Sequence, residues 1–152
     1  MNDIRAFVGH SFIEDDATLV AKFLHYFRTI SAMHPTFSWS HAESAEPKLL
    51  AEKVLALIED KNTFIGICTR KELATELDAL SVPYFQRSCF TGKSEDFVWK
   101  TSDWIIQEIG LAIGRKMEVI LLIEEGVRKP GGLQGDVEYI SFDREAPRKV
   151  VR

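Results

Sequence analysis

The chain contains little cysteine and proline, and it has no long hydrophobic run. Its 152 residues include two cysteines and five prolines, and neither cysteine has the spacing of a metal-binding motif. No apolar run approaches the roughly 20 residues that a membrane-spanning helix needs. An apolar strand pattern begins almost at the first residue, so we expect no signal peptide. These absences predict a reduced, cytoplasmic protein with no metal and no membrane partner.

An excess of positive charge is missing as well. Lys and Arg number 19 against 23 for Asp and Glu, the formal net charge is -4, and no basic run exceeds two residues. Direct binding to nucleic acid is therefore not expected. The 45% hydrophobic content suits a single globular domain with a sizeable core. We expect this domain to span residues 1–143 and the polar tail 144–152 to fray.

Hydrophobic periodicity predicts alternating strands and helices. Apolar runs at residues 4–8, 63–68 and 119–123, of which the last is continuous, are typical of buried strands of a sheet. Weaker alternation predicts two further strands, at residues 36–40 and 137–142. Apolar residues at helical spacing predict four helices, after Asp16, from Pro47, over 70–80 and over 101–114. Residues 82–100 lack a regular pattern and are interpreted as a long loop.

The order of these elements predicts the fold class. Strands that alternate with helices favour a flavodoxin-like, three-layer α/β sandwich, with a five-stranded parallel sheet and helices on both faces. Ligands bind such sheets beyond the carboxyl ends of the strands, beside the first strand. The loop at residues 9–12 would lie at that position.

The helix over residues 101–114 carries a carboxylate close to its apolar stripe. Ser102 can cap the first turn, and Ile105 and Ile109 face the sheet. Trp104 and Glu108 are four residues apart, so they lie one turn from each other. A solvated surface charge is the ordinary interpretation of Glu108. The apolar residues around it favour the alternative, a functional carboxylate.

Three segments resemble a TIR (Toll/interleukin-1 receptor) domain of the bacterial or archaeal, NAD-cleaving kind. Residues 5–12 are similar to the family's first strand and its Ser-containing turn. Residues 42–47 are similar to the loop between its second strand and second helix. Trp104 and Glu108 form a W-x-x-x-E pattern preceded by Ser102. The resemblance spans about residues 4–142, and segment 82–100 departs from it by its length.

The resemblance implies an NAD glycohydrolase or cyclase with NAD as substrate and no cofactor. It implies that Glu108 is catalytic and that five residues bind substrate, namely His10, Ser11, Phe12, Trp39 and Trp104. It also implies a role in antiviral or stress signalling, activation by assembly of several copies, and a sensor domain that is either fused or separate. The ordinary interpretations remain open, because the aromatic residues also suit core packing and His10 suits an exposed turn.

The implied reaction needs only one carboxylate. Nicotinamide in NAD is a cationic ring that leaves as a neutral molecule, so no general acid is required, whereas an ordinary glycosidase uses two carboxylates. A single glutamate can stabilise the positive charge that develops on the ribose. Two alternatives remain open. One is a non-enzymatic module that signals by self-association, and the other is an enzyme similar to nucleoside deoxyribosyltransferases.

Overall fold

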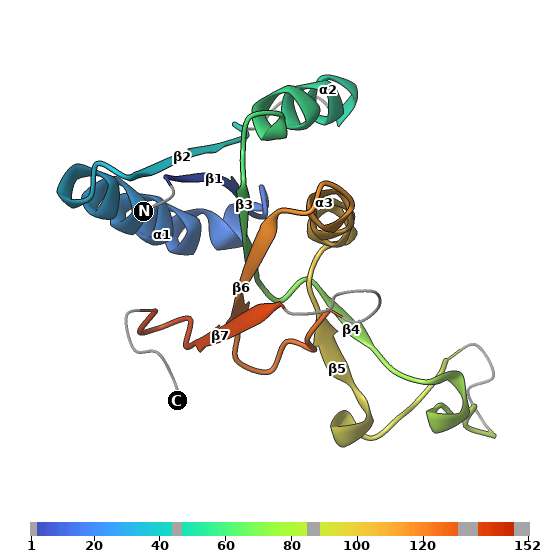
Figure 1. Ribbon diagram of the computed structural model, residues 1–152. Coiled ribbons are helices and arrows are strands. Elements are labelled where there is room, and N and C mark those ends of the chain that lie inside the picture. Colours follow the sequence, from blue (N-terminus) through green and yellow to red (C-terminus); the bar gives the residue numbers. More distant parts are fainter. Residues whose placement is uncertain (1–2, 44–46, 85–88, 131–136, 148–152) are drawn as a thin grey trace.

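A five-stranded, all-parallel sheet forms the centre of the molecule, as predicted. The computed structural model describes residues 3–43, 47–84, 89–130 and 137–147 (Figure 1). The sheet has the strand order β2-β1-β3-β6-β7. Its strands are β1 (Ile4–Gly9), β2 (Phe37–His41), β3 (Thr63–Cys68), β6 (Glu118–Glu124) and β7 (Glu138–Phe142). The three longest apolar runs become β1, β3 and β6, the interior strands, because only there are both faces covered.

Helices cover both faces of the sheet, which confirms the flavodoxin-like α/β class. Helix α1 (Ala17–Met33) packs on one face, whereas α2 (Pro47–Ile58) and α3 (Asp103–Gly114) lie on the other (Figure 1). Successive residues of β1 point to opposite faces, so Val8 joins the core beneath α1 and Phe7 joins the core beneath α3. Cys68 is buried as expected, and Cys89 is exposed; both are free thiols.

The prediction of a helix over residues 70–80 is wrong. These residues instead form the strand β4 (Glu72–Ala74) and a 3₁₀ turn at Leu77–Ala79. Strand β4 pairs antiparallel with β5 (Val98–Lys100), which lies inside the segment predicted to be a loop. Leu73 and Leu77, which suggested an apolar helix face, are 54% and 78% exposed. Pairing with a strand distant in sequence outweighed the local helical spacing.

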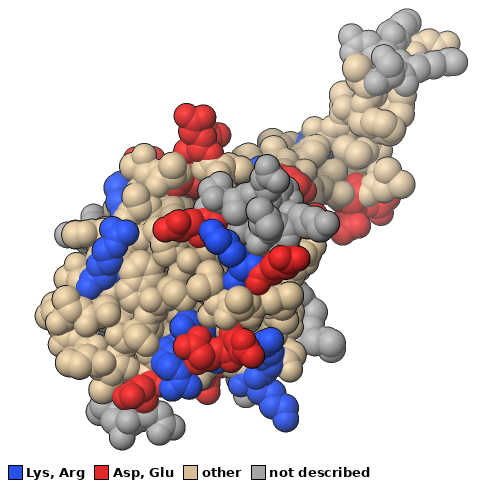
Figure 2. Space-filling view, turned by 90° about the horizontal axis from the view of Figure 1, so that it is seen from above, with Lys and Arg blue, Asp and Glu red and all other residues tan. Residues whose placement is uncertain are grey.

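The β4–β5 hairpin is the base of an arm that projects from the sandwich (Figure 1). Beyond the hairpin, the backbones of Ser81 and Thr91 exchange hydrogen bonds, and a second 3₁₀ turn covers Ser94–Asp96. Figure 2 shows the arm as a protrusion, and both signs of charge are interspersed over the rest of that face. No helix in the described parts of the chain is long and apolar enough to cross a membrane.

Candidate active site

Two glycines open space at the carboxyl edge of the sheet. Gly9, the last residue of β1, is the register partner of Gly66 in β3. Both lack a side chain on the face that α3 covers. A Cβ at Gly9 would lie 2.9 Å from Phe64 Cζ and would collide with Oε2 of Glu108. The missing side chain therefore makes room for a carboxylate from the neighbouring helix.

Glu108 occupies this space. It lies in the second turn of α3, whose first turn is capped by Ser102: Oγ accepts a hydrogen bond from the Ile105 amide at 3.4 Å. Ile105 and Ile109 are completely buried against the sheet, and this fixes the rotation of the helix about its axis. The same rotation buries Glu108, which is 4% exposed. Glu108 is therefore not an ordinary surface charge.

The two carboxylate oxygens of Glu108 have different surroundings. Trp104 Nε1 donates a hydrogen bond of 2.8 Å to Oε1. Oε2, which faces Gly9, has no hydrogen-bond partner among the described residues. Burial raises the pKa of Glu108 from 4.5 to about 7, and the hydrogen bond from Trp104 opposes that rise only in part. A buried carboxylate oxygen without a partner, on a group whose pKa is raised by desolvation, marks Glu108 as a candidate functional residue.

Trp104 separates two hollows at this edge. The first, of about 190 Å³, lies between α2 and α3 and includes Glu108 and Leu55 among its lining residues. The second, of about 250 Å³, lies against the loop after β1. The half-buried indole ring borders both hollows. Trp104 therefore holds the carboxylate through its ring nitrogen and also forms part of the wall on either side.

His10 lines the second hollow, but its ring is already engaged. Nδ1 lies 2.9 Å from the carbonyl oxygen of Ser11, and Nε2 lies 3.0 Å from Nδ1 of His41. Because a carbonyl only accepts, Nδ1 of His10 carries the proton, and Nε2 accepts from His41. Burial lowers the pKa of His10. His10 is thus a neutral residue that holds the loop after β1 against β2.

The other predicted substrate residues divide between the second hollow and the core on the α1 side. Ser11 and Phe12 line the second hollow together with His10. Phe12 packs edge-on against the His10 ring, with 5.0 Å between centroids. Trp39 belongs to the core on the α1 side, where it packs against Phe27 and stacks on His41. Trp39 is not among the described residues that line either hollow, so its predicted role in substrate binding has no support from this arrangement; its stacking partner His41 in turn contacts His10.

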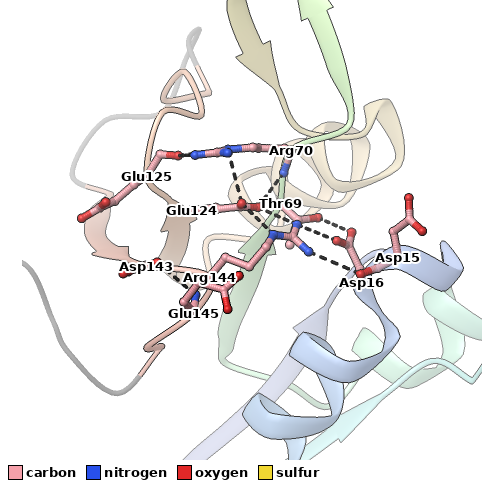
Figure 3. Close-up of polar contacts among 9 residues, drawn as sticks. All are labelled: Asp15, Asp16, Thr69, Arg70, Glu124, Glu125, Asp143, Arg144 and Glu145. Carbon is pink, nitrogen blue, oxygen red and sulfur yellow. Dashed lines mark hydrogen bonds and ion pairs between the residues drawn. The ribbon is translucent and has the colours of Figure 1, made fainter.

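A second acidic group lies at the same edge of the sheet, on the α1 side (Figure 3). Arg144 donates two hydrogen bonds of 2.8 Å to Glu124 and one of 2.8 Å to Asp16. Thr69 donates to the other oxygen of Asp16 at 2.6 Å. Hydrogen bonds to Glu124 and Asp16 raise the pKa of Arg144. The prediction that the tail frays is therefore wrong for Arg144; residues 148–152 lie outside the described part.

Arg144 joins the elements around it into one network. Glu124 ends β6, Asp16 precedes α1, and Thr69 follows β3. Both carboxylates are 1% exposed, so their charges need the arginine. This cluster was hard to predict, because an acidic residue such as Asp16 is ordinary at a helix start and Arg144 lies in the stretch that was expected to fray. An acidic residue directly after a buried strand, such as Glu124, was the available signal.

Lys71 was also missed by the sequence analysis. It follows β3 and lines the second hollow together with Ser102 and Trp104. A single lysine in a polar stretch carries no motif. The hairpin that turns the chain outward after residue 70 brings Lys71 to this edge, and its first strand lies in the stretch that was predicted to be a helix.

Fold and site together define an α/β protein of flavodoxin-like type with a buried, unneutralised carboxylate beside the first strand. No protein-family model matches the chain, and no curated protein matches it. A conserved protein from Enterococcus faecalis V583 has a similar structure, with a TM-score of 0.48 and 11% sequence identity. The match covers 80% of this chain and 64% of that protein's chain. So distant a similarity carries no information about function.

Proposed function

We propose that this domain cleaves the bond between nicotinamide and ribose in NAD, with Glu108 as the catalytic carboxylate. The observation that carries the proposal is the buried Glu108 side chain, with one oxygen held by Trp104 and the other free. No cation of the described residues forms an ion pair with it. Such a carboxylate is complementary to a cationic ligand, and the nicotinamide ring of NAD is a cation.

The raised pKa of Glu108 fits this chemistry. A carboxyl group with a pKa of about 7 is partly protonated at neutral pH in the empty site. The positive nicotinamide ring favours the ionised form, because a nearby opposite charge lowers the pKa of an acid. As the C–N bond breaks, its electrons neutralise the ring, and the positive charge moves to the ribose, where the carboxylate stabilises it. Water then attacks the ribose carbon and gives ADP-ribose and a proton, or an adenine nitrogen attacks and gives a cyclic product.

The size of the first hollow supports activation by assembly. Its volume of about 190 Å³ is below the roughly 300–1,000 Å³ of typical small-molecule sites. A second copy that supplies another wall would enlarge the site, as the resemblance to NAD-cleaving TIR domains implies. The same resemblance supports a role in antiviral or stress signalling, with a fused or separate sensor domain.

One observation favours a second candidate function, a non-enzymatic module that signals by self-association. The projecting arm exposes several large apolar side chains, which is unusual for a surface without a partner. They include Leu73, Leu77, Val82 and Phe90. Enzymatic activity and self-association are compatible, so activity has to be measured over a range of protein concentrations.

The test is release of nicotinamide from NAD, followed by chromatography at increasing protein concentration. Glu108→Gln keeps the shape and the acceptor for Trp104 but removes the charge, and we expect it to lower turnover by about 100-fold or more. Glu118→Gln is the matched control, because Glu118 is exposed at the opposite end of the sheet. We expect this control to retain activity.

The alternatives give different results in the same assay. Self-association without nicotinamide release at any concentration would favour the adaptor function. Exchange of bases on deoxynucleosides without cleavage of NAD would favour a transferase. Equal activity of Glu108→Gln and the unmodified protein would show that Glu108 is not the catalytic group.

A further inference from the structure

Lys71 brings a positive charge to the hollow on the far side of Trp104 from Glu108. This hollow, of about 250 Å³, is lined by His10, Ser11, Phe12, Ile13, Lys71, Ser102 and Trp104. Lys71 is the only residue among them with a positive charge, because His10 is neutral. The backbone amide of Lys71 donates to the carbonyl of Lys100 at 2.8 Å. The base of this side chain is therefore held in place by the hairpin.

The neighbouring cations are engaged elsewhere, whereas Lys71 is not. Arg70 forms an ion pair with Glu124 at 3.3 Å, donates to the carbonyl of Glu125 at 2.6 Å and lies over the Trp99 ring. Lys100 lies 3.8 Å from Asp103. No carboxylate of the described residues forms an ion pair with Lys71. A lysine that lines a hollow and has no ion-pair partner among the described residues is suited to bind an anion there.

The loop after β1 provides a second polar group but no second charge. Ser11 Oγ accepts a hydrogen bond from the Ile13 amide at 3.2 Å, so its hydroxyl proton remains free to donate. His10 has no free ring nitrogen, because both contact other protein groups. An anion in this hollow would therefore rely on Lys71 for charge and on Ser11 for a hydrogen bond.

We propose that Lys71 binds the phosphate groups of the substrate. The site would then select nucleotides such as NAD over nucleosides, which carry no phosphate. The identity of the ligand rests on the function proposed above. Trp104 borders both hollows. In NAD the diphosphate is bonded directly to the nicotinamide ribose. A ribose placed at Glu108 thus directs the diphosphate past Trp104 towards Lys71.

Binding of ADP-ribose, measured by titration calorimetry, tests this site without turnover. We expect Lys71→Gln to raise the Kd for ADP-ribose about tenfold or more, since a hydrogen bond to a charged group is lost. Lys71→Arg should retain most of the affinity, because it keeps the charge. Lys22→Gln makes the same charge change at an exposed position of α1 and should leave the Kd unchanged.

Kinetics with two substrates gives a second readout. Lys71→Gln should raise KM for NAD and leave kcat unchanged, whereas cleavage of nicotinamide riboside, which has no phosphate, should be unaffected. Unchanged ADP-ribose affinity in Lys71→Gln, or no ADP-ribose binding by the unmodified protein, would overturn the assignment. Binding that depends on Lys71 without any cleavage of NAD would refute the proposed activity and leave the phosphate site standing. Cleavage of NAD by the unmodified protein, together with an ADP-ribose affinity that Lys71→Gln leaves unchanged, would support the proposed activity and refute the phosphate site.

Discussion

Replacing Glu108 with Gln should stabilise the protein at alkaline pH, even though it removes the proposed catalytic group. Burial raises the pKa of Glu108 from 4.5 to about 7, so the folded state binds this proton more tightly than the unfolded chain does. As the pH rises from 4.5 to 7, the unfolded chain releases the proton first, and the free energy of unfolding falls. Above pH 7 the free energy of unfolding is lowered by the full amount, and below pH 4.5 it is not lowered by this group.

The size of the effect follows from the two pKa values. A shift of one pKa unit corresponds to about 1.4 kcal/mol. The rise in the pKa of Glu108 from 4.5 to about 7 therefore lowers the free energy of unfolding by about 3 kcal/mol once the group is ionised. Gln carries no charge and does not titrate, so Glu108→Gln escapes this cost. All other groups titrate alike in both proteins and cancel from the difference between them.

Urea unfolding of both proteins between pH 4.5 and 8 measures this difference. We expect the stability of Glu108→Gln relative to the unmodified protein to increase by about 2–3 kcal/mol over that range. Glu118→Gln, at an exposed glutamate, should show a difference that does not change with pH. A constant difference for Glu108→Gln as well would mean that Glu108 titrates as it does in water, which would refute the desolvated site.

Two further substitutions test the site and its support. Gly9→Ala brings a methyl group against Phe64 and Oε2 of Glu108, so it should destabilise the fold by about 1–3 kcal/mol and lower NAD cleavage. Gly110→Ala is the control: its methyl group meets open space on α3, so it should stabilise the helix by about 0.5–1 kcal/mol. Equal changes in the free energy of unfolding for the two variants, measured in urea, would contradict the close approach of Glu108 to Gly9. Arg144→Gln should cost about 2–4 kcal/mol, because buried Asp16 loses its ion pair and Glu124 keeps only the longer ion pair with Arg70, whereas Arg28→Gln on the exposed face of α1 should cost less than about 0.5 kcal/mol. A similarly small loss for Arg144→Gln would show that its ion pairs contribute little.

The central sheet was predictable because its signals are local and strong. Strands β1, β3 and β6 are predominantly apolar runs, and a parallel sheet covered on both faces requires such runs. The crossover helices carry apolar residues at helical spacing, and Ser102 does cap α3 as expected. From these elements alone, the alternating order leads to the observed fold class.

The arm was not predictable from local patterns. Residues 70–80 combine helix-forming residues with leucines at helical spacing, yet this stretch packs no helix face against the sheet. Strand β4 forms because β5 pairs with it, about 26 residues later in the chain by the register of Leu73 with Trp99. Such non-local pairing leaves no periodic signal in either short strand. Because a helix was predicted over residues 70–80, the position of Lys71 beside the second hollow was not predicted either.

The approach of Glu108 to the loop after β1 could be anticipated from topology. A helix that follows a strand's carboxyl edge starts at that edge, and Glu108 lies in its second turn. The sequence could not reveal that Gly9 makes room for the carboxylate, or that His10 is paired with His41. These features depend on side chains from different strands that meet only in the folded structure.

The two buried acidic sites at this edge differ in one respect that bears on function. Glu124 and Asp16 are neutralised by Arg144 together with Arg70, so their charges are used within the protein. Glu108 is also buried, but among the described residues it receives only the indole N–H of Trp104. Burying a carboxylate costs free energy at both sites. Cations of the described chain offset this cost for Glu124 and Asp16 but not for Glu108. A charge left uncompensated beside a hollow is available to a cationic ligand, and this contrast favours Glu108 over the more conspicuous arginine network as the reactive group.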